Sequence, residues 1–120
     1  MRYCLALDLK DDPALIACYE EHHRAVWPDV LRHLREHGVR GMEIFRLGTR
    51  MTMVMDTDDS VFDADRLASA TEADPVIRAW EDMMWKFQAP TPWTPAGRKW
   101  VPMTRIFDLQ MQAPSTSVES

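Results

Sequence analysis

The sequence predicts an α+β fold of the ferredoxin-like kind, in which strands and helices follow one another in the order βαββαβ. Apolar residues recur at every second position near the start of the chain and again in its middle, which is typical of half-buried strands. Between these stretches, two Asp-Pro pairs each place an N-cap residue before a proline at the first helical position. The alternation and the caps together indicate strands separated by helices.

The first forty residues are predicted to hold one strand and a helical stretch. In residues 3–10, every second side chain is Tyr or Leu, which predicts the first strand. Asp12 and Pro13 then open a helix as its N-cap and first residue. Pro28 can either break this helix or open a second one, and Gly38 is a suitable stop for the helical pattern.

The rest of the chain is predicted to contain a hairpin, two further helices and a closing strand. The hairpin turns at Gly48 and Thr49, between two apolar runs. Pro90, Pro92 and Pro95 predict an extended loop before the closing strand. The expected elements are strands at residues 39–47 and 51–56, a helix at 60–70 with Ser60 as its N-cap, a helix that begins at Asp74 and Pro75, and a last strand at 101–109.

Length and composition indicate a single globular domain. A chain of 120 residues fits one domain, which we place at residues 1–110, followed by a polar C-terminal tail at 111–120. A formal net charge of -5 argues against a nucleic-acid partner, because binding to phosphates needs a basic face. No apolar run has the length of a membrane span, and the first ten residues lack a signal-peptide pattern. We therefore expect a cytoplasmic protein with no membrane partner.

The predicted strands are too apolar for one face of the sheet to stay in water. Met42, Ile44, Met51 and Met53 lie in the two strands of the predicted hairpin. With the helical segments on one face of the sheet, the other face would expose apolar side chains, which usually marks an interaction surface. We therefore expect a homodimer, the commonest way to cover such a face.

Cysteine and histidine spacing gives no disulfide framework and no complete metal site. Cys4 falls in a strand pattern and Cys18 in a helix, so both are expected as small buried apolar side chains in a reducing compartment. His33 and His37 stand four residues apart, as in a zinc-binding helix, but no third ligand accompanies them. We expect these two histidines on a solvated helix face, and no metal or cofactor.

The candidate site is the stripe formed by Tyr19, His23 and Trp27, which recurs at four-residue spacing before Pro28. Residues four apart lie on one face of a helix, so a phenol and an imidazole would converge on one small volume. An aromatic body, a hydroxyl and a group that titrates near neutrality suit a small polyhydroxylated molecule. The same stripe is also typical of a plain core face, and His22 competes with His23 for the place facing a pocket.

The motif Tyr19-x-x-x-His23-x-x-x-Trp27-Pro28 resembles that of the L-rhamnose mutarotase family, and the similarity extends over residues 2–109. His37-Gly38 and the segment 105–109 also match. The resemblance implies a small dimeric sugar anomerase with a ferredoxin-like, dimeric α/β-barrel fold. It implies that His23 is the catalytic residue and that Tyr19 and Trp80 bind the substrate, a monosaccharide.

Two departures from the family pattern bear on the substrate. Ala79 stands where the family has the first tryptophan of an adjacent pair, and Met42 replaces a sugar-contacting tyrosine. The loop at residues 87–92 resembles an L-fucose-directed branch. We therefore predict a mutarotase that interconverts the α and β anomers of a 6-deoxy-L-hexose, L-fucose before L-rhamnose, by His-mediated acid/base ring opening. The alternatives are a cofactor-poor monooxygenase of the same barrel fold and a non-catalytic sugar-binding module.

Overall fold

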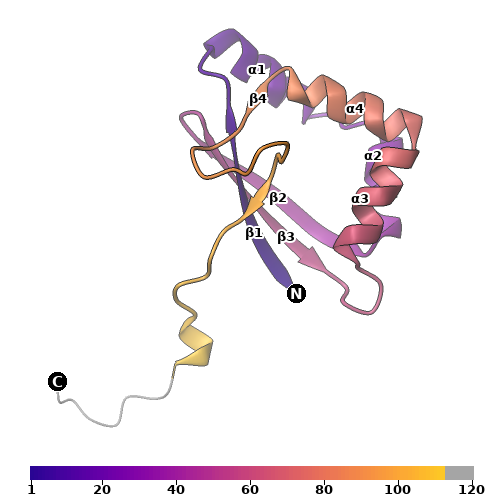
Figure 1. The fold of residues 1–120 in the computed structure, drawn as a ribbon, viewed down its shortest axis with the longest axis vertical. Helices are drawn as coiled ribbons and strands as arrows, with labels where there is room; N and C mark the ends of the chain where they lie inside the picture. The colour runs from indigo at the N-terminus through magenta and orange to yellow at the C-terminus, as the bar shows by residue number, and fades with distance from the viewer. Residues whose placement is uncertain (113–120) are drawn as a thin grey trace, which may run out of the picture.

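A computed structural model describes residues 1–112 of the chain, in which helices lie to one side of an antiparallel sheet (Figure 1). The strands are β1 (Arg2–Leu9), β2 (Val39–Leu47), β3 (Arg50–Thr57), β4 (Gln88–Ala89) and β5 (Val101–Pro102). The helices are α1 (Pro13–His22), α2 (Pro28–Glu36), α3 (Ala64–Ala73) and α4 (Pro75–Trp85), and a short 3-10 turn spans Leu109–Met111. The predicted tail lies, from residue 113 on, outside the described residues.

The strand order β2-β3-β1-β4 confirms the predicted ferredoxin-like fold. Strand β1 lies in the middle, where it pairs antiparallel with β3, β4 and β5. The helix starts at Asp12 and Asp74 are as predicted, because each aspartate side chain accepts two backbone N–H groups of the first helical turn. Pro28 opens a second helix, α2, rather than only breaking the first.

The register places the core between the sheet and the helices. Leu7 pairs with Met51 and Leu5 with Met53, and Ile44 pairs with Met53 from the other side. Residues opposite each other on neighbouring strands share a face, so all of these side chains point to one side. Leu7 and Met51 are the largest fully buried side chains, and they pack in one cluster with Trp80 of α4.

The same register corrects the reason given for a homodimer. Met42, Ile44, Met51 and Met53 lie on the helix-covered face, not on the open one. The open face carries other side chains, among them Cys4, Phe45 and Val54, and Phe45 is 56% exposed. Cys4 and Cys18 are both exposed, so the prediction that they are buried is wrong. A period of two shows which residues share a face but not which face is covered.

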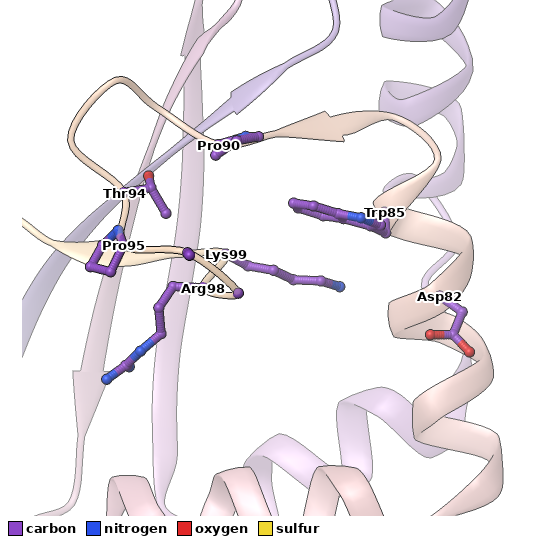
Figure 2. A pocket seen from close by; sticks show the side chains of 9 residues that line it. Asp82, Trp85, Pro90, Thr94, Pro95, Arg98 and Lys99 are labelled. Atoms are coloured by element: carbon purple, nitrogen blue, oxygen red, sulfur yellow. The ribbon is translucent and has the colours of Figure 1, made fainter.

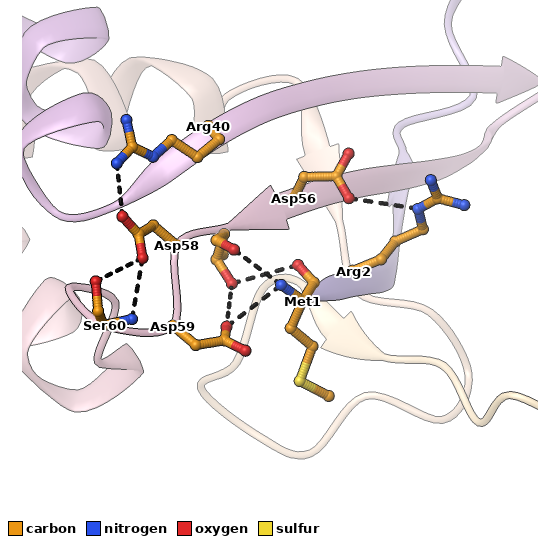
Figure 3. Close-up of polar contacts among 8 residues, drawn as sticks. Met1, Arg2, Arg40, Asp56, Asp58, Asp59 and Ser60 are labelled. Atoms are coloured by element: carbon orange, nitrogen blue, oxygen red, sulfur yellow. Dashed lines mark hydrogen bonds and ion pairs between the residues drawn. The ribbon is translucent and has the colours of Figure 1, made fainter.

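The N-cap of helix α3 lies three residues later than predicted, at Asp63 instead of Ser60, because Asp58 holds Ser60 in a turn (Figure 3). The Asp58 carboxylate accepts from the backbone N–H and the hydroxyl of Ser60 at 3.0 and 2.7 Å, and from Arg40 at 2.6 Å. The Ser60 hydroxyl, with Arg40, lowers the pKa of Asp58 to about 2. Asp63 is the actual N-cap of α3 and accepts the N–H of Arg66.

The closing strand predicted at 101–109 is wrong in length: only Val101–Pro102 pairs with β1, and Gln88–Ala89 adds a strand that was not predicted. Beyond Met103, whose N–H donates to the carbonyl of Cys4 at 2.8 Å, residues 104–112 run away from the sheet as a C-terminal arm (Figure 1). Its apolar side chains are exposed, Ile106 by 93% and Leu109 by 73%. No helix in residues 1–112 is long and apolar enough to span a membrane.

Candidate active site

The three predicted site residues come together where the end of α1 meets α4. The rings of Tyr19 and His23 lie 4.4 Å apart between centroids, and those of His23 and Trp80 lie 5.8 Å apart. Trp27 joins them, with its ring 5.2 Å from that of Trp80. Tyr19 and Trp80 are buried, whereas His23 is half-buried. His23 and Trp27 are thus the members of this aromatic cluster that solvent reaches, whereas Tyr19 and Trp80 are covered.

The chain brings these side chains together by ending one helix and starting another. Helix α1 ends at His22, and His23 is its C-cap, with its backbone N–H directed to the carbonyls of Tyr19 and Glu20. Trp27 is the N-cap residue of α2, because Pro28 cannot extend α1. The prediction that Trp27 continues one helical stripe is therefore wrong, although a tight turn still places its ring beside Trp80.

The hydrogen bond of the His23 side chain defines which ring nitrogen carries the proton in the neutral form. Its Nδ1 lies 2.9 Å from the carbonyl oxygen of Tyr19. A carbonyl oxygen can only accept, so Nδ1 is the donor and Nε2 keeps its lone pair. The neighbouring His22 packs instead against Phe87, with ring centroids 5.6 Å apart. Of the two histidines, His23 is the one beside Tyr19 and Trp80.

Tyr19 is held by a residue that sequence reasoning did not select for the site. The side-chain Nε2 of Gln88 donates to the Tyr19 hydroxyl at 3.1 Å. Burial raises the pKa of Tyr19 to about 12, although the Gln88 hydrogen bond acts in the opposite direction. Tyr19 is therefore a neutral phenol at physiological pH. In the sequence, Gln88 stands out only as part of the loop at residues 87–92 that resembles the L-fucose-directed branch. Its contact with Tyr19 depends on the pairing of β4 with β1, which no local pattern indicates.

Helix α4 positions Trp80. Its N-cap, Asp74, accepts the N–H groups of Val76 and Ile77 at 2.9 and 3.4 Å. Trp80 points inward together with Ile77 and Met84, on the face of α4 that packs against the sheet and α1. Ala79 is exposed, so this position contributes nothing to the aromatic cluster. Met42 is half-buried against a second core cluster under β2 and β3.

His33 and His37 form a structural pair rather than the solvated one predicted. His33 is buried, and its Nε2 lies 3.0 Å from the hydroxyl of Thr71 on α3. Burial, followed by the charge of His37 4.7 Å away between ring centroids, lowers the pKa of His33. Within residues 1–112, no group of three His, Cys, Asp or Glu side chains is placed to hold a metal ion.

A groove of about 560 Å³ lies on another side of α4, under the proline-rich loop (Figure 2). Lys99 reaches across it from the loop to α4, donates to the carbonyl of Glu81 at 2.9 Å, and lies 5.4 Å from the ring of Trp85. The loop thus folds over a helix of its own chain. Tyr19, His23 and Trp80 do not line this groove.

Comparison with known proteins identifies the family. The family model described as L-rhamnose mutarotase matches residues 2–109, almost all of the described chain. The chain belongs to the L-rhamnose mutarotase family. Members of this family are carbohydrate isomerases, which confirms the predicted enzyme class. Family membership also agrees with the motif around Tyr19 and His23, although it does not test what each residue does.

Individual relatives of this mutarotase-family chain agree in sequence and in fold. An L-fucose mutarotase of Xanthomonas campestris pv. campestris is 44% identical over 110 residues, which cover 90% of this chain and 87% of that protein. The crystal structure of an L-rhamnose mutarotase from Formosa agariphila superposes with a TM-score of 0.65 at 16% identity, covering 91% of this chain and 98% of that one. A polyketide cyclase, tetracenomycin F2 cyclase from Streptomyces glaucescens, gives 0.55 at 19% identity, with 95% and 99% covered. These two structures support the fold alone.

Proposed function

We propose that this protein interconverts the α and β anomers of a 6-deoxy-L-hexose, with L-fucose as the preferred sugar and L-rhamnose next. The observation that carries the proposal is the position of His23, whose ring lies beside a buried phenol and a tryptophan ring while its Nε2 keeps a lone pair. The similarity to a protein named L-fucose mutarotase, at 44% identity, supports the choice of sugar. Ala79 and Met42 stand where the family pattern has a tryptophan and a tyrosine, which supports a sugar other than L-rhamnose.

The reaction needs two proton movements and no change in composition. The anomeric hydroxyl loses its proton, the ring oxygen gains one, and the bond between C1 and the ring oxygen breaks to give the open-chain aldehyde. Rotation about the C1–C2 bond and the reverse steps then give the other anomer. His23 acts as the acid/base, because an imidazole both takes up and gives back a proton near neutral pH. Such a group contributes about a hundred- to ten-thousand-fold.

Tyr19 and Trp80 bind and orient the sugar. Tyr19 remains a phenol across the physiological range and acts as a hydroxyl donor that orients the sugar or exchanges its second proton. Trp80 packs against the sugar ring, since aromatic faces suit the C–H side of a pyranose. Ring opening by these groups involves no redox step and no covalent intermediate, so the proposed mechanism uses no cofactor.

NMR saturation transfer between the anomeric protons of L-fucose, and separately of L-rhamnose, tests the proposal. We expect faster anomer exchange in the presence of catalytic amounts of the protein, with the larger acceleration for L-fucose. Acceleration of neither sugar would contradict the proposal. Saturable sugar binding without acceleration would then indicate a binding module, and oxygen consumption with a bound aromatic ligand would indicate a monooxygenase.

We also propose that the chain functions as a homodimer in the cytoplasm, forming the dimeric barrel predicted for its family. The open face of the sheet, with Phe45 56% exposed, and the apolar side chains of the C-terminal arm support a partner at this face. Analytical ultracentrifugation should give a dimer that Phe45→Asp dissociates. Val76→Asp, a matched change at an exposed residue of α4, should remain dimeric. A monomeric wild-type protein at micromolar concentration would contradict the dimer.

A further inference from the structure

The side-chain amide of Gln88 is buried, and one of its ends is unpaired in the part of the chain that the structure describes. Gln88 is 4% exposed, and its Nε2 donates to Tyr19, but its Oε1 has no hydrogen-bond partner within residues 1–112. Buried polar atoms in folded proteins are almost always hydrogen-bonded, because an unpaired one is costly. Turning the amide over would exchange its two ends and still leave one of them unpaired. Among the residues that the structure describes, the site therefore holds a buried polar atom that lacks a partner.

The backbone holds this amide in place. Gln88 belongs to the short strand β4 and is registered opposite Leu9 of β1. On one side, the carbonyl of Phe87 accepts the N–H of Lys10 at 2.9 Å, and on the other, Pro90 begins the proline-rich loop. On this paired backbone the side chain is 4% exposed, so its free end does not reach solvent. It therefore presents an acceptor in one direction, next to the hydroxyl of Tyr19.

The two neighbouring groups offer a donor and an acceptor at the same point. The Tyr19 hydroxyl accepts from Gln88 and still has its own proton to donate, because the phenol does not ionise near neutral pH. The free Oε1 of Gln88 can only accept. A ligand hydroxyl both accepts and donates, so it satisfies both groups at once. A carboxylate or phosphate oxygen has no proton for Oε1, and an ammonium group has no lone pair for Tyr19.

We propose that Gln88 is a specificity-determining residue whose amide, together with the Tyr19 hydroxyl, binds one ring hydroxyl of the sugar. The inference rests on the proposed function, which supplies the sugar. Tyr19 contacts His23 through its ring and Gln88 through its hydroxyl, so we assign to Gln88 a hydroxyl other than the anomeric hydroxyl that His23 serves. L-fucose and L-rhamnose differ in configuration at C2 and C4. A fixed donor-acceptor pair at either carbon would therefore favour one of the two sugars.

The experiment combines one substitution with a series of sugars that each lack one hydroxyl. Gln88→Met keeps the length of the side chain and removes both polar ends. Its effect is measured on L-fucose and on 2-deoxy-, 3-deoxy- and 4-deoxy-L-fucose, as kcat/KM for anomer exchange and as the Kd from tryptophan fluorescence. Gln112→Met makes the same change at an exposed glutamine and serves as the control.

We expect Gln88→Met to weaken binding and to lower kcat/KM for L-fucose by roughly tenfold or more, the usual effect of leaving one buried hydrogen bond unmade. One deoxy sugar should be poor for the wild type and lose nothing further in Gln88→Met. An equal loss for all four sugars, or no loss, would overturn the role of Gln88. If the variant does not fold, the wild type alone still tests the proposal. Its kcat/KM should be roughly tenfold lower for one of the deoxy sugars than for L-fucose, and an equal kcat/KM for all of these sugars would overturn the proposal.

The two readouts separate this inference from the proposed function. Sugar binding that depends on Gln88, without any faster anomer exchange, supports the role of Gln88 and contradicts the mutarotase proposal. Faster anomer exchange that Gln88→Met leaves unchanged supports the mutarotase proposal and contradicts the role of Gln88. A wild-type protein that binds none of these sugars overturns both.

Discussion

The hydrogen bond between Tyr19 and Gln88 should appear as a coupling energy between the two side chains. Tyr19→Phe removes the acceptor at 3.1 Å and leaves the amide of Gln88, which is 4% exposed, with no partner at either end within residues 1–112. Leaving a buried polar group unpaired in this way costs about 1 to 3 kcal/mol. Adding Gln88→Met to Tyr19→Phe removes the orphaned amide as well, so the double variant should be no less stable than Tyr19→Phe alone.

Thermal unfolding followed by circular dichroism measures this coupling. A chain of 120 residues unfolds with an entropy of about 0.25 kcal/mol/K, from about 2.1 cal/mol/K per residue. Tyr19→Phe should therefore lower Tm by about 4 to 12 °C, and the double variant should lower it by no more than that. Protein concentration must be held constant, because dimerisation would make Tm depend on it. Strictly additive losses from the two single substitutions would refute the reasoning.

Three further predictions concern stability. Asp74→Ala removes the cap that accepts two N–H groups of α4 and should cost about 1 kcal/mol, or about 4 °C in Tm, whereas Asp65→Ala inside α3 should change little. In urea unfolding, Gly38→Ala should destabilise the protein more than Gly48→Ala. Both glycines have positive φ, but a Cβ added at Gly38 would lie 2.9 Å from the backbone nitrogen of Phe62, whereas one added at Gly48 would meet no atom within 4 Å. Because the pKa of His33 is lowered by burial, the unfolded chain binds the proton more readily, so stability should fall as pH drops through about 6.5, the ordinary value. His33→Gln should flatten that pH dependence in urea midpoints, and an unchanged slope would exclude this cause.

The sequence predicted the elements that carry local signals. The Asp12 and Asp74 caps and the stop at Gly38 are where expected, because each is a contact between residues close in the chain. Ser60 is not an N-cap, because its backbone N–H and its hydroxyl both donate to the Asp58 side chain in a turn. A serine in such a turn and a serine that caps a helix have no distinct pattern in sequence. The prediction of a long closing strand failed because Ile106 and Phe107 are residue types common in strands but find no partner strand within residues 1–112.

Within the candidate site, helix spacing predicted only the contact between residues one turn apart. Tyr19 and His23 are one helical turn apart, so their proximity follows from the sequence. Trp80 entered through the family resemblance, and its place beside His23 depends on how α4 packs against α1. The choice of His23 over His22 rests on the ring contacts, and Gln88 is brought to Tyr19 across 69 residues by strand pairing. Such long-range contacts have no periodic pattern from which they could be predicted.

The central claim is that His23 moves the protons in a sugar anomer exchange. The most direct measurement compares the exchange rate of L-fucose anomers by NMR saturation transfer in the wild type, His22→Asn and His23→Asn at equal concentration. We predict that His22→Asn accelerates exchange nearly as well as the wild type, and that His23→Asn, although folded, loses at least about a hundredfold. A His23→Asn variant that exchanges anomers at the wild-type rate would contradict the account.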